Sequence, residues 1–174
     1  MTTGGYFEHK ERVEKEAVKT LRCGIITASD TRTLETDASG DLLITQLSEA
    51  GHTIAQREVV RDEAAQITKL IETMIDADCA VIIINGGTGI AKRDSTFEAV
   101  DRLLEKRLPG FGELFRMLSY PEIGPAAMLS RATAGVYRGA LIFSLPGSPH
   151  AVGLALEKLI MPELTHLVWE TVRR

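Results

Sequence analysis

The sequence is poor in cysteine and carries no excess of positive charge. Its 174 residues include two cysteines, and 20 Lys or Arg stand against 24 Asp or Glu, for a formal net charge of −4. Cys23 and Cys79 fall in stretches predicted to be buried strands, so we interpret them as packed thiols rather than a disulfide or metal site. With no basic stripe on any predicted helix, the charge balance predicts that nucleic acid is not a partner.

Long apolar runs and metal-binding clusters are also missing. No apolar stretch approaches the roughly 20 residues of a membrane span, and the N-terminus lacks the apolar core of a signal peptide. We therefore expect a cytoplasmic protein with no membrane partner. The four histidines are scattered along the chain, which argues against a zinc site, and the sequence shows no serine–histidine–aspartate triad.

The chain divides into an N-terminal arm, residues 1–20, and a single domain, residues 21–174. The arm is rich in Glu, Lys and Arg, so it is either a solvated tail or a segment that packs on a neighbouring subunit. In the domain, apolar stretches typical of strands alternate with amphipathic stretches typical of helices. This order requires a mostly parallel sheet with right-handed crossovers and helices on both faces.

The predicted elements follow from apolar periodicity, turn residues and helix caps. The predicted strands are 21–27, 53–60, 79–84, 134–137 and 140–145, the last two forming a hairpin through Arg138-Gly139. The predicted helices are 37–50, one capped by Asp62, 95–107, 111–118, 125–129 and one from 149 that is bent or restarted at Pro162.

A glycine-rich loop follows the most apolar of these strands. Residues 79–84 are apolar throughout and lead through Asn85 into Gly86-Gly87-Thr88-Gly89. Glycines allow positive φ and close approach, and the free N–H groups of such a loop suit an anion, most often a phosphate. The loop matches neither a Walker loop nor the dinucleotide fingerprint. Taken alone, it leaves both ligand binding and a purely structural turn open.

Three polar segments follow predicted strands, at residues 28–37, 85–94 and 146–149. Because the carboxyl ends of parallel strands gather at one edge of a sheet, we expect these segments to form one pocket.

Two aspartates in these segments, Asp37 and Asp94, each precede a predicted helix, where helix capping is the alternative role. Residues Ser95 to Glu98 match a capping box, which predicts that Ser95 caps the following helix. The carboxylate of Asp94 is then available to bind a ligand. Two carboxylates beside an anion cradle predict a phosphate ester bridged by Mg²⁺.

Seven short motifs occur in a fixed order between residues 21 and 167. They are Ser29-Asp30, Asp37-x-Ser39-Gly40, Gly86-Gly87-Thr88-Gly89, Arg93-Asp94, Pro109-Gly110-Phe111-Gly112-Glu113, Ser130-Arg131-Ala132 and Leu145-Pro146-Gly147-Ser148-Pro149. Each motif alone is weak, but together in this order they resemble the MoaB/MogA family of molybdenum-cofactor biosynthesis proteins. The charged arm and the run 111–120 are more similar to the MoaB branch of that family.

The resemblance implies a three-layer α/β/α sandwich, the molybdopterin-binding fold, that assembles into a homo-oligomer, either a trimer or a hexamer. It implies that the chain binds molybdopterin and adenylylates it with Mg-ATP, releasing pyrophosphate, with Asp37 and Asp94 as catalytic residues and Mg²⁺ ligands. The residues that it implies for binding molybdopterin or the nucleotide are Ser29, Asp30, Gly86, Gly87, Thr88, Gly89, Arg93, Glu113, Ser130, Arg131, Pro146, Gly147 and Ser148.

This reaction suits a site without a poised histidine. The nucleophile is a phosphate monoester that is already anionic at neutral pH, so no strong general base is needed. Catalysis then consists of positioning two anions and neutralising their charge with a metal and backbone amides. Phe97 stands where adenylyltransferases of the family often have proline, and we expect it to pack.

Two other functions remain open at this point. One is a non-catalytic molybdopterin carrier of the same pathway, which needs the pterin-side loops but not the metal carboxylates. The other is a generic nucleotide-binding regulatory domain, against which the pterin-side segments argue.

Overall fold

The computed structural model of the chain describes residues 19–172. The predicted arm at residues 1–20 lies almost entirely outside the described residues, so its role stays a prediction. In chain order the elements are β1 (Arg22–Ala28), η1 (Leu34–Thr36), α2 (Ala38–Glu49), β2 (Thr53–Val60), α3 (Ala64–Asp76), β3 (Val81–Asn85), α4 (Thr96–Leu103), β4 (Lys106–Arg107), α5 (Pro109–Ile123), η2 (Gly124–Leu129), β5 (Thr133–Tyr137), β6 (Ala140–Leu145), α6 (Pro149–Ala155), η3 (Leu156–Ile160) and α7 (Leu164–Val172).

The strands form one six-stranded sheet in the order β2-β1-β3-β6-β5-β4. β2, β1, β3 and β6 are parallel, whereas β5 and β4 each run antiparallel to their neighbour. Every residue of the central strand β3 is buried, which explains why its first four residues, Val81 to Ile84, are all apolar. The prediction of a mostly parallel sheet is confirmed.

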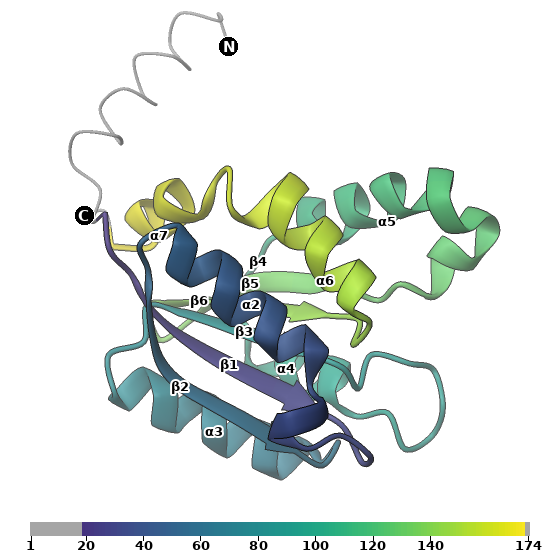
Figure 1. Cartoon of the computed structure of the whole chain (residues 1–174), viewed down its shortest axis with the longest axis horizontal. Coiled ribbons are helices and arrows are strands. Elements are labelled where there is room, and N and C mark those ends of the chain that lie inside the picture. Colours follow the sequence, from purple (N-terminus) through teal and green to yellow (C-terminus); the bar gives the residue numbers. More distant parts are fainter. Residues whose placement is uncertain (1–18, 173–174) are drawn as a thin grey trace, which may run out of the picture.

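Helices cover both faces of the sheet (Figure 1). α2, α5, α6 and α7 pack on one face in a core that includes Ile83 and Phe143, and α3 and α4 pack on the other in a core that includes Ile84 and Val100. Neighbouring residues of β3 enter different cores because successive side chains of a strand point to opposite faces. The fold is therefore the expected three-layer α/β/α sandwich.

The hairpin and the bent C-terminal region are confirmed. β5 and β6 pair through Arg138 and Gly139, whose φ angles of 48° and 80° provide the left-handed turn that such a hairpin needs. After β6, α6 continues into the π-helical turn η3, and a new helix, α7, begins at Leu164, shortly after Pro162.

The region between α4 and η2 differs from the sequence prediction. The helix predicted for 95–107 ends at Leu103, because residues 106–107 form the edge strand β4 beside β5. The two short helices predicted near 111–118 and 125–129 are one helix, α5, followed by the 3-10 segment η2. α5 continues through Pro121 and stops at Gly124, which has a φ of 60°.

The predicted capping box of α4 does not form. The Ser95 side chain makes no cap bond within its own helix, and the Glu98 carboxylate pairs with Arg131 instead.

None of the helices in residues 19–172 has the length and apolar character that crossing a bilayer requires.

Candidate functional site

The three polar segments meet at the carboxyl edge of the parallel strands. β1, β3 and β6 are neighbours, and their register places Thr27 beside Asn85 and Asn85 beside Leu145, so the three exit loops begin at the same level. The N–H of Gly86 donates to the carbonyl of Leu145 at 3.0 Å and joins the second segment to the third. The structure therefore brings the segments together as expected.

Close backbone packing explains two of the glycines at this edge. Gly86 has a φ of 94°, and a Cβ there would overlap the carbonyl oxygen of Ala28. A Cβ on Gly147 would lie 3.0 Å from the Cα of Gly86. A side chain at position 86 would therefore push the first two loops apart.

The glycine-rich loop presents a run of unpaired backbone donors. From Gly87 to Ile90, four consecutive N–H groups donate to no acceptor among residues 19–172. Gly89 and Ile90 are exposed, so this part of the loop is open to a ligand. Successive free amides form the kind of concave donor site that binds phosphate.

Asp37 lies at the start of α2, beside the carboxyl edge of the sheet, and is fully buried. It caps α2 by accepting from the Gly40 N–H at 3.0 Å, and it accepts from the Thr27 hydroxyl at 2.7 Å. The guanidinium of Arg57 donates to it at 3.0 Å, and that of Arg32 lies 3.8 Å from its second oxygen. Both carboxylate oxygens are engaged, so the prediction that Asp37 binds a metal requires it to give up one of these partners.

Asp94 occupies a more open position at the end of the glycine-rich loop, where it is half-buried. Its Oδ2 atom accepts from the Ala91 N–H at 2.9 Å and lies where it would overlap a Cβ on Gly89. Its Oδ1 atom accepts no hydrogen bond from residues 19–172. Asp94 can therefore offer one oxygen to a cation bound beside the loop.

A third carboxylate, Asp62, lies against the glycine-rich loop. It was not identified as a site residue from the sequence. Its Oδ1 atom accepts from the N–H and hydroxyl groups of Ser95 and Thr96 at 2.8–3.1 Å. Its Oδ2 atom would lie 2.6 Å from a Cβ on Gly87 and accepts no hydrogen bond from the described residues. The sequence predicted that Asp62 caps α3, but Glu63 is at that position and Asp62 caps α4 across the sheet edge.

The signal that could have identified Asp62 is its place in the chain. It follows β2, which is parallel to β1, so its loop opens at the same edge as the three selected segments.

Arginines join the segments to one another. Arg93 lies 3.5 Å from Asp30 and connects the second segment to the first. Arg32, whose backbone N–H donates to the Ser29 hydroxyl at 3.2 Å, reaches the carbonyl of Gly147 with its guanidinium at 2.8 Å. Arg32 was not selected from the sequence, although it follows Ser29-Asp30 in the same loop. These cations favour an anionic ligand at this edge.

Arg131 approaches the glycine-rich loop from the segment that precedes β5. Its Nε atom donates to the carbonyl of Thr88 at 2.8 Å, and its Nη2 atom donates to the carbonyl of Gly89. The same guanidinium pairs with Glu98 and lies 4.6 Å from the centre of the Phe97 ring. The hydrogen bond from Arg131 lowers the pKa of the Glu98 carboxyl.

The remaining predicted residues lie on neighbouring elements. Ser148 caps α6 by accepting from the Ala151 N–H at 3.1 Å, and Pro146 precedes it in the same partly buried loop. Ser130 ends η2 next to Arg131. Glu113 is exposed near the start of α5, where no contact ties it to the glycine-rich loop within the described part of the chain.

The described residues, 19–172, contain no group of three or more His, Cys, Asp or Glu side chains that could hold a metal ion. Mg²⁺ does not require such a group, because one or two carboxylates together with phosphate oxygens and water satisfy it.

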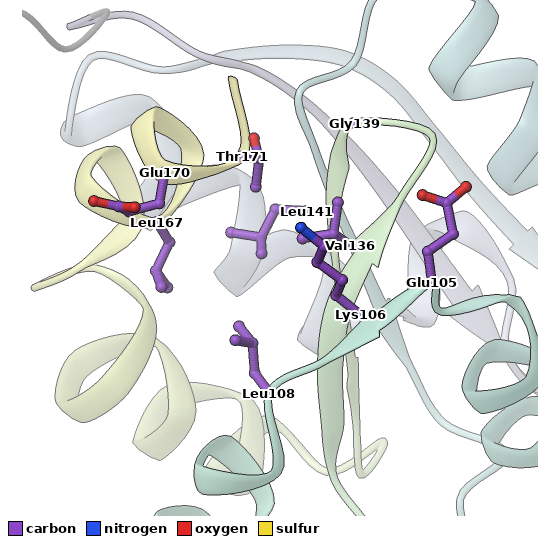
Figure 2. Close-up of a pocket in the computed structure, with 9 residues that line it drawn as sticks. All are labelled: Glu105, Lys106, Leu108, Val136, Gly139, Leu141, Leu167, Glu170 and Thr171. Atoms are coloured by element: carbon purple, nitrogen blue, oxygen red, sulfur yellow. The ribbon is translucent and has the colours of Figure 1, made fainter. Parts of the chain in front are cut away.

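A separate cavity of about 340 Å³ lies between the β4–β5–β6 region and α7 (Figure 2). It includes Gly139, in the turn that precedes β6, so it opens at the amino edge of that strand, opposite the loops described above. Its lining residues are Glu105, Lys106, Leu108, Val136, Gly139, Leu141, Leu167, Glu170 and Thr171. The cavity is therefore not part of the candidate site.

Comparison with known proteins gives a consistent result. Residues 24–166 match the family described as "Probable molybdopterin binding domain". Molybdenum cofactor biosynthesis protein B of Bacillus subtilis (strain 168) is 54% identical over 165 residues, which cover 94% of this chain and 95% of that protein. The protein of the same name from Staphylococcus carnosus (strain TM300) is 48% identical over 166 residues, covering 94% and 98%.

Solved structures of similar proteins point to the same family. A crystal structure of a molybdenum cofactor biosynthesis protein B superposes with a TM-score of 0.87 at 52% identity, covering 91% of this chain and 100% of that one. The tungsten cofactor synthesizing protein MoaB from Pyrococcus furiosus superposes with a TM-score of 0.82 at 38% identity, covering 89% and 99%.

Proposed function

Because this chain belongs to the MoaB/MogA family of molybdenum-cofactor biosynthesis proteins, we propose that it binds molybdopterin and adenylylates it with Mg-ATP. The observation that carries the proposal is the run of four unpaired amides in the glycine-rich loop, with carboxylates packed against Gly87 and Gly89. Amides of this kind bind phosphate, and carboxylates beside them can hold the cation that accompanies a nucleotide.

The proposed reaction is a transfer of the adenylyl group. A phosphate oxygen of molybdopterin attacks the α-phosphorus of ATP, the bond from that phosphorus to the oxygen leading to the β-phosphate breaks, and pyrophosphate leaves. Since the nucleophile is already an anion, the protein's task is to bring two anions together and to stabilise the charge at the α-phosphate.

We assign the nucleotide phosphates to the glycine-rich loop, Gly86 to Gly89. The free N–H groups supply donors there without a charged side chain, and Arg93 adds positive charge at the loop's exposed side. Such fixed donors act without reorganisation during the reaction, which is why they stabilise charge effectively.

Mg²⁺, when bound, would neutralise phosphate charge, and Asp94 is the carboxylate best placed to hold it because its Oδ1 atom accepts from no donor in residues 19–172. Asp62 fits the same role through Oδ2. Asp37, the second ligand expected from the family resemblance, fits less well, because binding would require Thr27 or Arg57 to release its oxygen.

We assign molybdopterin to the part of this sheet edge formed by the loops after β1 and β6. The proposed contacts come from Ser29 and Asp30 in the first segment and from the loop after β6, which Arg32 joins to that segment. The remaining proposed residues on this side are Glu113, Ser130, Pro146, Gly147 and Ser148, whereas Arg131, which the family resemblance also implies, is assigned to holding the glycine-rich loop.

We also infer that the protein is a homo-oligomer, either a trimer or a hexamer. An exposed apolar surface on α5 and η2 supports this inference. Leu114, Met117, Tyr120 and Met128 are between 46% and 72% exposed there. Apolar patches of this kind mark association surfaces in soluble proteins.

The decisive experiment is incubation of the purified protein with molybdopterin and Mg-ATP. We expect adenylyl-molybdopterin and pyrophosphate to form in equal amounts, and neither to form when Mg²⁺ is omitted. Chromatography of the pterin product and an enzymatic assay for pyrophosphate measure the two independently.

A molybdopterin carrier is the second candidate function. It is favoured by one observation: Asp37, expected to be a metal ligand, is buried and fully hydrogen-bonded. Tight binding of molybdopterin with no adenylylated product and no pyrophosphate would support the carrier and reject the enzyme.

A further inference from the structure

We propose that Arg131 is a positioning residue, which holds the glycine-rich loop so that its amides face the bound phosphate, and that it does not contact the ligand itself. The identity of the ligand as Mg-ATP rests on the proposed function. The positioning role rests only on contacts within the protein.

The guanidinium of Arg131 uses all three of its nitrogens on protein groups. Nε and Nη2 donate to the carbonyls of Thr88 and Gly89, and Nη1 donates to Glu98. The Cζ atom of the group lies over the Phe97 ring. The side chain is only 23% exposed, so little of it remains available to a ligand.

These contacts fix the direction of two free amides. The described chain has no cis peptide bond, and in a trans peptide the C=O and N–H groups point in opposite directions. When Arg131 holds the carbonyls of Thr88 and Gly89, the N–H groups of Gly89 and Ile90 must point away from it. Both N–H groups belong to the unpaired run that we assign to the phosphates.

The loop needs such a restraint because its own sequence is permissive. Gly86 and Gly87 have φ angles of 94° and 63°, and glycine moves between such conformations at little cost. An interaction from outside the loop is therefore required to select one orientation of its amides.

Arg131 is in turn held by the first turn of α4. Glu98 and Phe97 both belong to that turn, and Asp62 holds the start of the helix. A planar guanidinium can bond two carbonyls and a carboxylate simultaneously, whereas a lysine ammonium cannot reproduce this geometry. The arrangement therefore depends on arginine specifically and on the carboxylate of Glu98.

Positioning and direct contact predict opposite effects for the substitution Glu98→Gln. If Arg131 positions the loop, loss of the Glu98 charge loosens the guanidinium and weakens Mg-ATP binding. If Arg131 contacts the ligand, removing a competing negative charge leaves the affinity unchanged or raises it.

The first measurement needs no ligand. Amide chemical shifts and order parameters of Gly89 and Ile90 are recorded by NMR for the full chain and for Arg131→Lys and Glu98→Gln. The matched controls are Arg107→Lys and Asp101→Asn, because Asp101 of the same helix, α4, pairs with Arg107 of β4, with Nε and Oδ1 at 2.9 Å, outside the loop. We expect both loop amides to shift and become more mobile in the first two variants and not in the controls.

The second measurement is the affinity for Mg-ATP by calorimetry. We expect Arg131→Lys to weaken binding by about tenfold and Glu98→Gln by about threefold, since each loses charge-assisted hydrogen bonds, and the controls to bind like the parent protein. Thermal unfolding of each variant checks that the fold is retained.

Unchanged loop amides in both variants, or unchanged or tighter Mg-ATP binding in Glu98→Gln, would overturn the positioning role. If the amides respond but the parent protein binds no Mg-ATP, the positioning role stands and the proposed function is the part that fails.

Discussion

At the scale of single residues, Asp37 and Asp94 show that two aspartates at one sheet edge can have different roles. Asp37 is fully buried and pairs with Arg57, whereas Asp94 lies at a half-exposed loop with one free oxygen. A buried charge that loses its partner is costly, whereas a change at an exposed position costs little.

We therefore expect Asp37→Asn to lower the free energy of unfolding by about 3 kcal/mol, because the guanidinium of Arg57 loses its buried partner and keeps only the exposed Asp41. Asp94→Asn should change it by no more than about 0.5 kcal/mol and yet abolish adenylylation of molybdopterin. Urea unfolding and the pyrophosphate assay measure the two effects separately.

Asp41→Asn is the matched control. Asp41 also pairs with Arg57, at 2.8 Å, but its side chain is 61% exposed, so its loss should cost less than about 1 kcal/mol. An Asp94→Asn protein that adenylylates molybdopterin at the full rate would refute the role of that residue.

The buried side chain of His52 should make the free energy of unfolding depend on pH. The residue is 9% exposed, its Nδ1 atom accepts from the Leu21 N–H at 3.4 Å, and burial lowers its pKa. Below the unfolded-state pKa of about 6.5, the unfolded chain binds a proton that the folded state does not. Stability should therefore fall as the pH drops from about 6.5 toward the folded-state pKa, with a slope of at most about 1.4 kcal/mol per pH unit.

Urea unfolding of the parent protein and of His52→Asn between pH 7.5 and 5.5 tests this dependence. Asparagine keeps an acceptor for the Leu21 N–H but does not titrate, so its curve should be flatter. Equal slopes for the two proteins would show that other groups cause the dependence.

At the scale of elements, the start of α4 is decided by a residue distant in the chain. Ser95 does not cap the helix, and Asp62, from the loop after β2, accepts from the N–H groups of Ser95 and Thr96 at 3.1 and 3.0 Å. This contact ties the β2 side of the sheet to the glycine-rich loop, because Oδ2 of the same carboxylate lies against Gly87 of that loop.

Asp62→Ala should lower the free energy of unfolding by about 1–2 kcal/mol and speed hydrogen exchange at the Ser95 and Thr96 amides, because the helix loses its cap. Glu63→Ala is the control, since Glu63 precedes α3 without a side-chain cap bond and should cost about 0.5 kcal/mol or less. Faster exchange at the start of α3 instead would favour the cap predicted from the sequence.

The strands were more predictable than the helix ends. The predicted bounds 53–60 and 140–145 match β2 and β6, because turn residues such as Gly51 and Gly139 mark where each strand begins, and they are local signals. The end of α4 was not predictable, because residues 106–107 leave the helix to pair with β5, which comes 26 residues later at Thr133. Such pairing overrides local helical preference.

At the scale of the whole molecule, the exposed apolar face of α5 predicts assembly. Met117 is 60% exposed and lies one turn from Leu114 on the same helix. A charge on a buried subunit interface disrupts it, whereas a charge on a solvated surface does not.

We expect Met117→Glu to convert the homo-oligomer to a smaller species, as measured by light scattering after size-exclusion chromatography. Val172→Glu, at a 63% exposed position on α7, is the control and should leave the mass unchanged. A monomeric parent protein, or an unchanged mass for Met117→Glu, would reject this surface as the interface.

The candidate site was predictable in its location but not in its internal contacts. The segments after β1, β3 and β6 were expected to meet because parallel strands end at one edge, and the register of Thr27, Asn85 and Leu145 shows that they do. Arg32 and Asp62 were missed because their roles depend on contacts with residues distant in the chain, Gly147 for Arg32 and Thr96 for Asp62.

The sequence by itself determined the alternation of strands and helices, the mostly parallel character of the sheet and the edge at which the polar loops open. These properties follow from apolar periodicity and chain direction, which are local. Only the tertiary structure decided that Asp37 is buried, that Asp62 caps α4 and that Arg131 holds the glycine-rich loop. The role of a charged side chain depends on which distant groups donate to it or accept from it, and folding alone brings those groups together.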